Sequence, residues 1–192
     1  MPITEADLPD FPLSPPSSLR TDRLCLRHHH MDDLDQLVTL IGAYDVARWL
    51  ARVPYPYGPG DGADFIAATG HGLNDSGELV YAIADPDDDG LMGGVGLIFG
   101  VDGAELGYWL GLPYQGRGYA SEAVAAVLDL AFGKLDLSHV HADVRTGNTR
   151  SRRLLEAQGF RENGRAAIYQ MIEKRYVTGP RYELARAQWR TA

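Results

Sequence analysis

The order of the periodic segments between residues 78 and 163 constrains the fold of this chain more than any other feature. Three β-like runs, ELVYAIA, LMGGVGLIFG and AELGYWLGL, are joined by DPDDDG and VDG, which predicts a meander of antiparallel strands. The pattern then changes, because YASEAVAAVLDLAF has helical spacing, SHVHADV alternates as a strand, and NTRSRRLLEAQG is again amphipathic. A strand, helix, strand succession of this length implies a right-handed crossover between parallel strands.

The remaining segments add elements but no second domain. RLCLR has strand character, and MDDLDQLVTLIG predicts an amphipathic helix. Shorter helices are expected near residues 46–51 and 62–73, on either side of the breaker-rich VPYPYGPGDG. Residues 1–18 are rich in proline and polar residues, which favours an extended N-terminal arm followed by a single domain over residues 19–192. The expected fold is a mixed α/β sheet of six or seven strands, antiparallel in its first half, with helices on both faces.

Composition and charge restrict the class of function. The chain has 192 residues, 45% of them hydrophobic, and a formal net charge of −8, so a general attraction to nucleic acid or anionic lipid is not expected. No apolar run reaches the roughly 18 residues of a spanning helix, and the acidic N-terminus lacks an apolar signal core, so the expected location is the cytoplasm. The single cysteine excludes an internal disulfide. His28, His29 and His30 alternate in direction along an extended segment and lack partners at metal-ligand spacing, so no metal is expected.

The turn QGRG, residues 115–118, lies between the last run of the meander and the following helix. Bare backbone N–H groups at a helix N-terminus form an anion site, and Arg117 adds a cation. The same glycines also suit a tight connection that binds nothing, and spacing alone leaves both possibilities open. A P-loop would need Lys and Ser or Thr where Tyr119 and Ala120 stand, and a dinucleotide fingerprint would need glycine or alanine in place of Ser121.

QGRGYA also matches the pattern Gln/Arg-x-x-Gly-x-Gly/Ala that binds the coenzyme A pyrophosphate in the GCN5-related N-acetyltransferases, the GNAT superfamily. The resemblance extends to LRTDRLCLR, DVARWL, ELGYWL, PYQGRGYASEAV, HVHADV and NTRSRRLLEAQGF, in that order, and on to the C-terminal RYELARAQW. These blocks resemble the branch of the superfamily that includes the ribosomal-protein alanine N-acetyltransferases. The resemblance implies a twisted, mostly antiparallel sheet in which a central parallel strand pair splays apart.

The resemblance implies that acetyl-CoA is the co-substrate. Its pantetheine arm is expected against the strand ELGYWLGL, and its diphosphate on the start of the next helix. The implied cofactor contacts are Tyr108, Trp109, Leu110, Gln115, Gly116, Arg117, Gly118, Tyr119, Ala120, Ser121 and Asn148. Asn148 also suits a helix N-cap, and the two roles are compatible.

The implied reaction is direct attack of a primary amine on acetyl-CoA within a ternary complex. The amine must lose a proton and the departing thiolate must gain one. Glu105 could act as the base through a water, or it could be a strand-end polar residue. The hydroxyl of Ser151 could reach the sulfur. Many relatives instead carry a tyrosine seven residues after the asparagine, where this chain has Leu155, and this favours Ser151 as the proton donor.

The acceptor is left open among three hypotheses. A protein N-terminus is favoured by the branch resemblance. A small amine such as a polyamine, an amino acid or an aminoglycoside is the second, and a non-catalytic acyl-CoA-binding module is the third. Lys174 and Thr178 stand where close relatives tend to have glycine and aspartate, near the acceptor entrance, and this leaves open an acceptor that differs from theirs. Homodimers are frequent among relatives, but no segment of this chain demands one.

Overall fold

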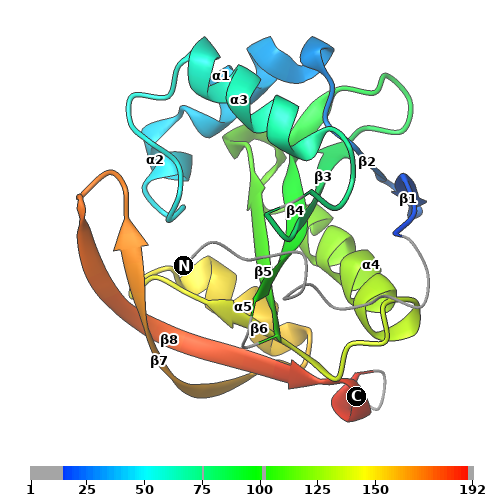
Figure 1. Ribbon diagram of the computed structural model, residues 1–192, viewed down its shortest axis with the longest axis vertical. Helices are drawn as coiled ribbons and strands as arrows, with labels where there is room; N and C mark the ends of the chain where they lie inside the picture. Colours follow the sequence, from blue (N-terminus) through cyan, green and yellow to red (C-terminus); the bar gives the residue numbers. More distant parts are fainter. Residues whose placement is uncertain (1–14, 75, 101–102, 190–192) are drawn as a thin grey trace.

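One twisted sheet runs through the molecule, and its first six strands lie side by side in chain order (Figure 1). The computed structural model describes residues 15–74, 76–100 and 103–189. The sheet has eight strands in the order β1-β2-β3-β4-β5-β6-β8-β7. Their bounds are Ser18–Arg20 (β1), Cys25–Arg27 (β2), Glu78–Ala84 (β3), Leu91–Gly100 (β4), Gly103–Leu110 (β5), His139–Asp143 (β6), Arg161–Gln170 (β7) and Arg175–Ala185 (β8). Neighbouring strands are antiparallel except β5 and β6, which confirms the predicted mixed sheet with one central parallel pair.

The sheet has more strands than the six or seven expected, because the N-terminal strand segment is a hairpin. β1 pairs with β2, and the chain reverses between them where the Thr21 N–H donates to the Leu24 carbonyl at 3.0 Å. Residues 1–14 lie outside the described residues, so the extended arm stays a prediction there. The first described strand begins at Ser18, and the division between an arm and a domain at residue 18 stays a prediction.

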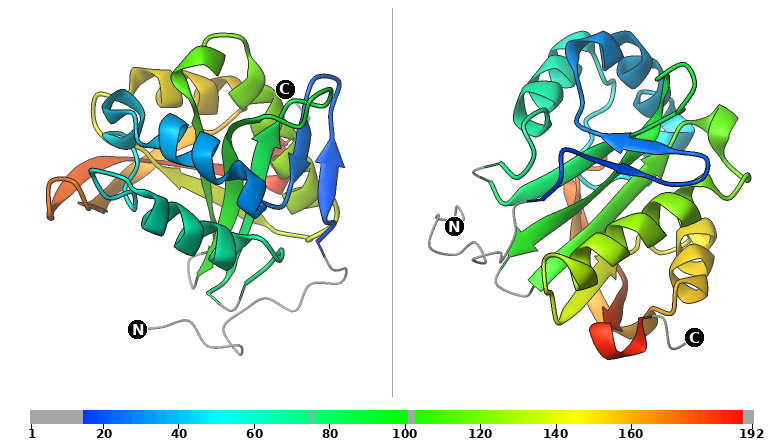
Figure 2. Two further views of the ribbon diagram at one scale, coloured as in Figure 1. Left: turned by 90° about the horizontal axis from the view of Figure 1, so that it is seen from above. Right: turned by 90° about the vertical axis from the view of Figure 1, so that its right-hand side faces the viewer.

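Helices cover both faces of the sheet, as predicted. α1 and α3 lie on one face, and α4 and α5 on the other (Figure 2). Their bounds are Leu34–Ile41 (α1), Tyr44–Ala47 (α2), Pro59–Thr69 (α3), Tyr119–Gly133 (α4) and Thr149–Ala157 (α5), with single 3-10 turns at Met31–Asp33 (η2), Leu112–Tyr114 (η3) and Arg186–Gln188 (η4). Among the helices of the described ranges, none has the length and apolar character needed to cross a membrane.

The larger core lies between the sheet and α4. The residues of α4 at helical spacing, Val124, Val127, Leu128 and Ala131, are fully buried there, as their periodicity predicted. A smaller cluster under α1 and α3 contains Leu37, Ile41, Ile66, Ala82 and Leu91. The two cores hold the central strands from both sides, so β5 is a rigid support for a site at its edge.

Strand β5 has two different edges. Toward β4 it is paired along its whole length, from Gly103 opposite Gly100 to Leu110 opposite Gly93. Toward β6 the pairing is confined to Ala104 with Val140 and Glu105 with His141. Residues 106–110 therefore form an edge of β5 that has no pairing to β6 among the described residues. We call residues 106–110 the open edge of β5, and it corresponds to the splayed pair that was predicted.

Candidate active site

The backbone of the open edge alternates in the direction of its polar groups. The Gly111 N–H donates to the Met92 carbonyl at 2.9 Å, so Gly111 faces β4. Because the direction reverses at each residue of a strand, Trp109 also faces β4, while Leu106, Tyr108 and Leu110 direct their N–H and C=O groups away from β4. The Leu110 carbonyl accepts a hydrogen bond from the side-chain amide of Gln115 at 2.9 Å. The groups of Leu106 and Tyr108 face the side on which an extended ligand could pair with the strand.

The turn after β5 presents a helix N-terminus at the end of this edge. Gly116 and Gly118 have φ of 78° and 83°, in the left-handed region that favours glycine. The Glu122 N–H is bonded to the Gly118 carbonyl, which leaves the N–H groups of the preceding first-turn residues 119–121 without a partner inside the helix. A Cβ built on Gly116 would meet no heavy atom within 4 Å, so the approach to the turn is open there. This arrangement fits a diphosphate, because bare amides and the positive end of a helix dipole both favour an anion.

Arginines surround the turn, and one of them was not found from the sequence. Arg117 is exposed within the turn. Arg23 comes from the segment before β2 and donates to the Arg117 carbonyl at 3.0 Å. Arg23 also pairs with Glu122 at 2.6 Å and lies over the Tyr119 ring at 4.8 Å from its centroid. Partial burial raises the pKa of Glu122, but hydrogen bonds from Thr21 and Arg23 outweigh it, and the net shift is downward. Arg23 therefore stabilises the turn by bonding both to the Arg117 carbonyl and to the ionised Glu122, although it lies outside the sequence motif.

The turn is also tied to α5. The carbonyl oxygen of the Gln115 side chain accepts a hydrogen bond from Arg150 at 2.5 Å. The Ser121 hydroxyl is bonded to the side-chain amide of Gln158 at 2.7 Å. The expected cofactor contacts Gln115 and Ser121 therefore already have protein partners, whereas Gly116, Arg117 and Gly118 are exposed.

At the start of α5, Asn148 acts as the N-cap that its sequence suggested. Its side-chain oxygen accepts from the Ser151 N–H at 3.2 Å. The Ser151 hydroxyl lies 2.9 Å from the hydroxyl of Tyr108, so the structure brings two residues of the predicted site into contact across the open edge. Burial raises the pKa of Tyr108 to about 12, although the bond to Ser151 opposes the shift. Tyr108 is therefore a neutral phenol throughout the physiological range. Leu155 is fully buried in the core and carries no polar group toward this region.

Trp109 differs from its neighbours in the predicted set. Its indole packs with the cluster under α1 and α3, and a Cβ on Gly94 would lie 2.6 Å from the indole nitrogen. Leu110 is buried with the α4 core on the opposite face. Side chains of adjacent strand residues alternate between the faces of a sheet, so the three expected contacts Tyr108, Trp109 and Leu110 cannot all face one ligand with their side chains.

Glu105 lies at the point where the paired and open parts of β5 meet, opposite His141. Burial raises the pKa of Glu105, and the negative charge of Asp143 adds to this, while Arg52 and Arg181 oppose it. Asp143 is itself bonded by Arg181 at 2.7 Å. Glu105 is four residues before Trp109 on β5, so the two side chains lie on the same face of the sheet, and Tyr108 lies on the other face. A carboxylate with a raised pKa in this position is a stronger base than an exposed one.

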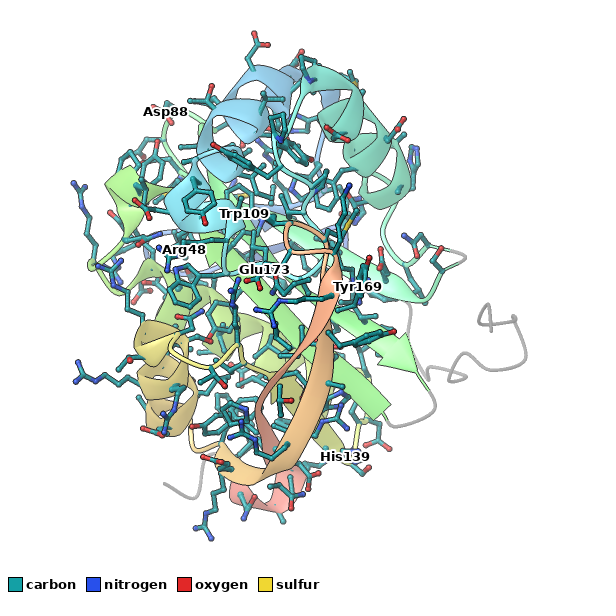
Figure 3. All side chains as sticks on the ribbon, turned by 90° about the vertical axis from the view of Figure 1, so that its left-hand side faces the viewer. Arg48, Asp88, Trp109, His139, Tyr169 and Glu173 are labelled. Carbon is teal, nitrogen blue, oxygen red and sulfur yellow. The ribbon has the colours of Figure 1, made fainter. Side chains whose placement is uncertain are left out.

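The hairpin of β7 and β8 reaches back over this face to the segment that follows α2. The Met171 N–H donates to the Ala51 carbonyl at 3.1 Å. Arg145, after β6, forms an ion pair with Glu173 of the hairpin and donates to the Arg48 carbonyl. Figure 3 looks onto this side, where Arg48, Trp109 and Glu173 are labelled. The family resemblance placed Lys174 and Thr178 of this hairpin near the acceptor entrance, but no sequence pattern pairs Arg145 with Glu173.

The histidines do not assemble a metal site in the part of the chain that the structure describes, where no group of three or more His, Cys, Asp or Glu could hold a metal ion. His29 is buried against Phe65, with its rings 5.1 Å apart between centroids. Burial lowers the pKa of His29 to about 4. His30 lies near Asp33, which is bonded by Arg27 at 2.8 Å. These residues belong to the packing of the α1 region.

The open strand edge and the glycine-lined helix N-terminus lie together at the centre of a splayed sheet. This combination suits a long anionic ligand. The chain matches the family described as "Acetyltransferase (GNAT) domain" over residues 23–161. The protein therefore belongs to the GNAT acetyltransferase family and is an N-acetyltransferase.

Three known proteins are similar to this chain in sequence or in structure. It is 27% identical to the uncharacterized N-acetyltransferase p20 of Bacillus licheniformis over 175 residues, which is 90% of this chain and 98% of that protein. The ribosomal-protein-S5-alanine acetyltransferase from Vibrio fischeri has a similar structure, with a TM-score of 0.70, 20% identity, and coverage of 90% of this chain and 98% of that one. The spermidine N-acetyltransferase from Vibrio cholerae, in complex with CoA and spermine, has a TM-score of 0.72 at 23% identity, with 88% and 98% covered. At these identities the two structures establish a shared fold and leave the acceptor open.

Proposed function

We propose that this protein transfers an acetyl group from acetyl-CoA to a primary amine, with a protein N-terminus as the favoured acceptor. The observation that carries the proposal is the juxtaposition of the open edge of β5 with the bare N-terminus of α4. The first offers backbone groups to a pantetheine arm, and the second offers amides and Arg117 to a diphosphate. The bound CoA in the similar spermidine N-acetyltransferase supports this assignment.

The reaction assigns separate tasks to this chain's residues. A C–N bond forms between the amine nitrogen and the acetyl carbon, and the C–S bond breaks. We assign Glu105 to remove the amine proton through a water and Ser151 to protonate the departing sulfur. Orientation of the two reactants can contribute up to about 7–11 kcal/mol of barrier reduction, so the acid and base add to an effect that the splayed sheet already provides.

A small cationic amine is the second candidate acceptor. The net charge of −8 favours a cationic substrate, and one of the similar structures is a spermidine N-acetyltransferase. The similar structure of a ribosomal-protein acetyltransferase supports the protein N-terminus instead. A non-catalytic acyl-CoA-binding module gains no support from membership of an enzyme family. A cytoplasmic location, the absence of a metal and a homodimer stay predictions.

The test is a thiol-release assay of the purified protein with acetyl-CoA against N-terminal peptides, polyamines, amino acids and aminoglycosides. We expect release with peptides and a loss of release in Arg117→Glu, because the substitution places a negative charge beside the diphosphate. Arg165→Glu is the matched control, since Arg165 is an exposed arginine on β7. Release with polyamines alone would move the assignment to a small amine. A failure to bind CoA in calorimetry would overturn the proposal.

A further inference from the structure

Among the residues that the structure describes, Tyr108 joins the open edge of β5 to the proposed proton donor by a side-chain hydrogen bond. Its hydroxyl lies 2.9 Å from the Ser151 hydroxyl, where either oxygen can donate, and 3.2 Å from the Ser151 carbonyl, which can only accept. The two residues are 43 positions apart in the chain. We infer that Tyr108 is a positioning residue that holds the Ser151 hydroxyl for proton donation at the open edge. This inference rests on the proposed function.

The backbone of Ser151 is fixed independently of Tyr108. Its N–H is held by the N-cap Asn148 at 3.2 Å, and it lies in the first turn of α5. The side-chain oxygen, in contrast, can rotate among three staggered positions. Among the residues that the structure describes, Tyr108 is the side chain that the Ser151 hydroxyl contacts by a hydrogen bond. Asn148 therefore places the serine, and Tyr108 selects the direction of its hydroxyl.

The direction of donation within the pair gives Tyr108 its effect. The Tyr108 hydroxyl has a single hydrogen. When it donates to the Ser151 hydroxyl oxygen at 2.9 Å rather than to the Ser151 carbonyl at 3.2 Å, the serine's own hydrogen is free to point to another acceptor. As the C–S bond breaks, the serine hydrogen moves to the sulfur as a proton while the Tyr108 hydrogen moves to the serine oxygen, so no alkoxide is left on Ser151. Tyr108 regains its proton from water after the thiol leaves. The pKa of Tyr108 is raised to about 12, mainly by burial, so the donor is retained over the working range of pH.

A purely structural role for the pair is a separate possibility with a different signature. The bond also joins β5 to α5, as the bond between Gln115 and Arg150 does. If Tyr108 only stabilised this junction, its loss would lower the melting temperature or weaken acetyl-CoA binding, and it would act independently of Ser151. A positioning role predicts instead a loss of kcat that depends on the presence of Ser151.

The experiment measures kcat and KM for Tyr108→Phe, Ser151→Ala and the double variant, with the acceptor that supports thiol release. We expect Tyr108→Phe to lower kcat by about tenfold or more, with KM for acetyl-CoA changed by less than about twofold. Ser151→Ala should lower kcat at least as much, and the double variant should match Ser151→Ala.

Tyr81→Phe is the matched control, because Tyr81 is a buried tyrosine of β3, two strands along the sheet from Tyr108, and its hydroxyl donates to the Pro16 carbonyl at 2.7 Å. It should keep its kcat whatever thermal stability it loses, so the comparison separates a loss of kcat from a loss of stability. The inference is overturned by an unchanged kcat in Tyr108→Phe, by losses that multiply in the double variant, or by a rise in KM alone. A wild-type protein that neither binds acetyl-CoA nor releases thiol would overturn the proposed function instead.

Discussion

The two edges of β5 differ in how their backbone groups are satisfied. Toward β4, residues Gly103–Leu110 are paired along the whole strand, and glycines on β4 allow a close approach. Toward β6, pairing stops after Glu105. Buried backbone groups without a partner cost free energy, so an open edge at the centre of a sheet is typical of a place where a ligand completes the hydrogen bonding. The paired edge gives β5 its rigidity, and the open edge gives it a binding role.

The largest effect is expected on the paired edge. A Cβ on Gly93 would lie 2.2 Å from the Trp109 carbonyl oxygen, so Gly93→Val must push β4 away from β5. We expect a loss of about 3 kcal/mol in the free energy of unfolding and a fall of roughly 6–12 °C in Tm, measured by calorimetry. Gly107→Val is the matched control, because a Cβ there meets no atom within 4 Å. Equal losses in both variants would mean that close approach at Gly93 does not set the β4 and β5 spacing.

The next effect concerns Glu105, where the two kinds of edge meet. Its pKa is raised, mainly by burial and then by Asp143, so its basic form is lost as pH falls through that raised value. An ordinary glutamate has a pKa of about 4.3. We expect kcat/KM to decline on the acidic side of the pH profile at a higher pH than this value. Glu105→Gln should lower kcat by about 100-fold and remove that decline. An unchanged pH profile in the variant would contradict the role as base.

Stability supplies an independent check on the same residue. A raised pKa in the folded state stabilises the protein fully below the unfolded pKa, and this contribution is lost as pH rises through the folded value. The free energy of unfolding of the wild type should therefore fall relative to that of Glu105→Gln as pH rises from the unfolded pKa to the folded pKa of Glu105. Denaturant titrations at several pH values would measure it.

The smallest effect is expected at the end of the open edge. Gln115 satisfies the Leu110 carbonyl and also accepts from Arg150. Gln115→Leu should cost about 1 kcal/mol in stability, because water can replace the lost partners at a partly exposed site. Gln115→Glu keeps the acceptor for Arg150 but loses the donor to Leu110, so it separates the two contributions. A loss as large as that of Gly93→Val would mean that this edge is as tightly constrained as the paired one.

Patterns of period two and 3.6 predicted most elements correctly, but they failed where glycine and proline had a structural use. The helix expected from Gly62 begins earlier, because Pro59 occupies its first turn and the Gly58 N–H donates to Asp61 at 2.8 Å. The segment that was interpreted as a breaker is therefore a helix start. β1 was missed because three residues carry little periodicity, and its pairing with β2 depends on the turn at Thr21.

The sequence by itself determined the order of strands and helices, the buried face of α4 and the glycine turn at its N-terminus, because each is encoded within a few neighbouring residues. The tertiary structure decided which side chains meet. Tyr108 contacts Ser151 across 43 positions, and Arg23 reaches Glu122 across 99. It also placed Trp109 on the face opposite Tyr108. Such contacts depend on how far β5 and β6 diverge and how α5 packs beside them, and no local pattern of residues specifies those distances.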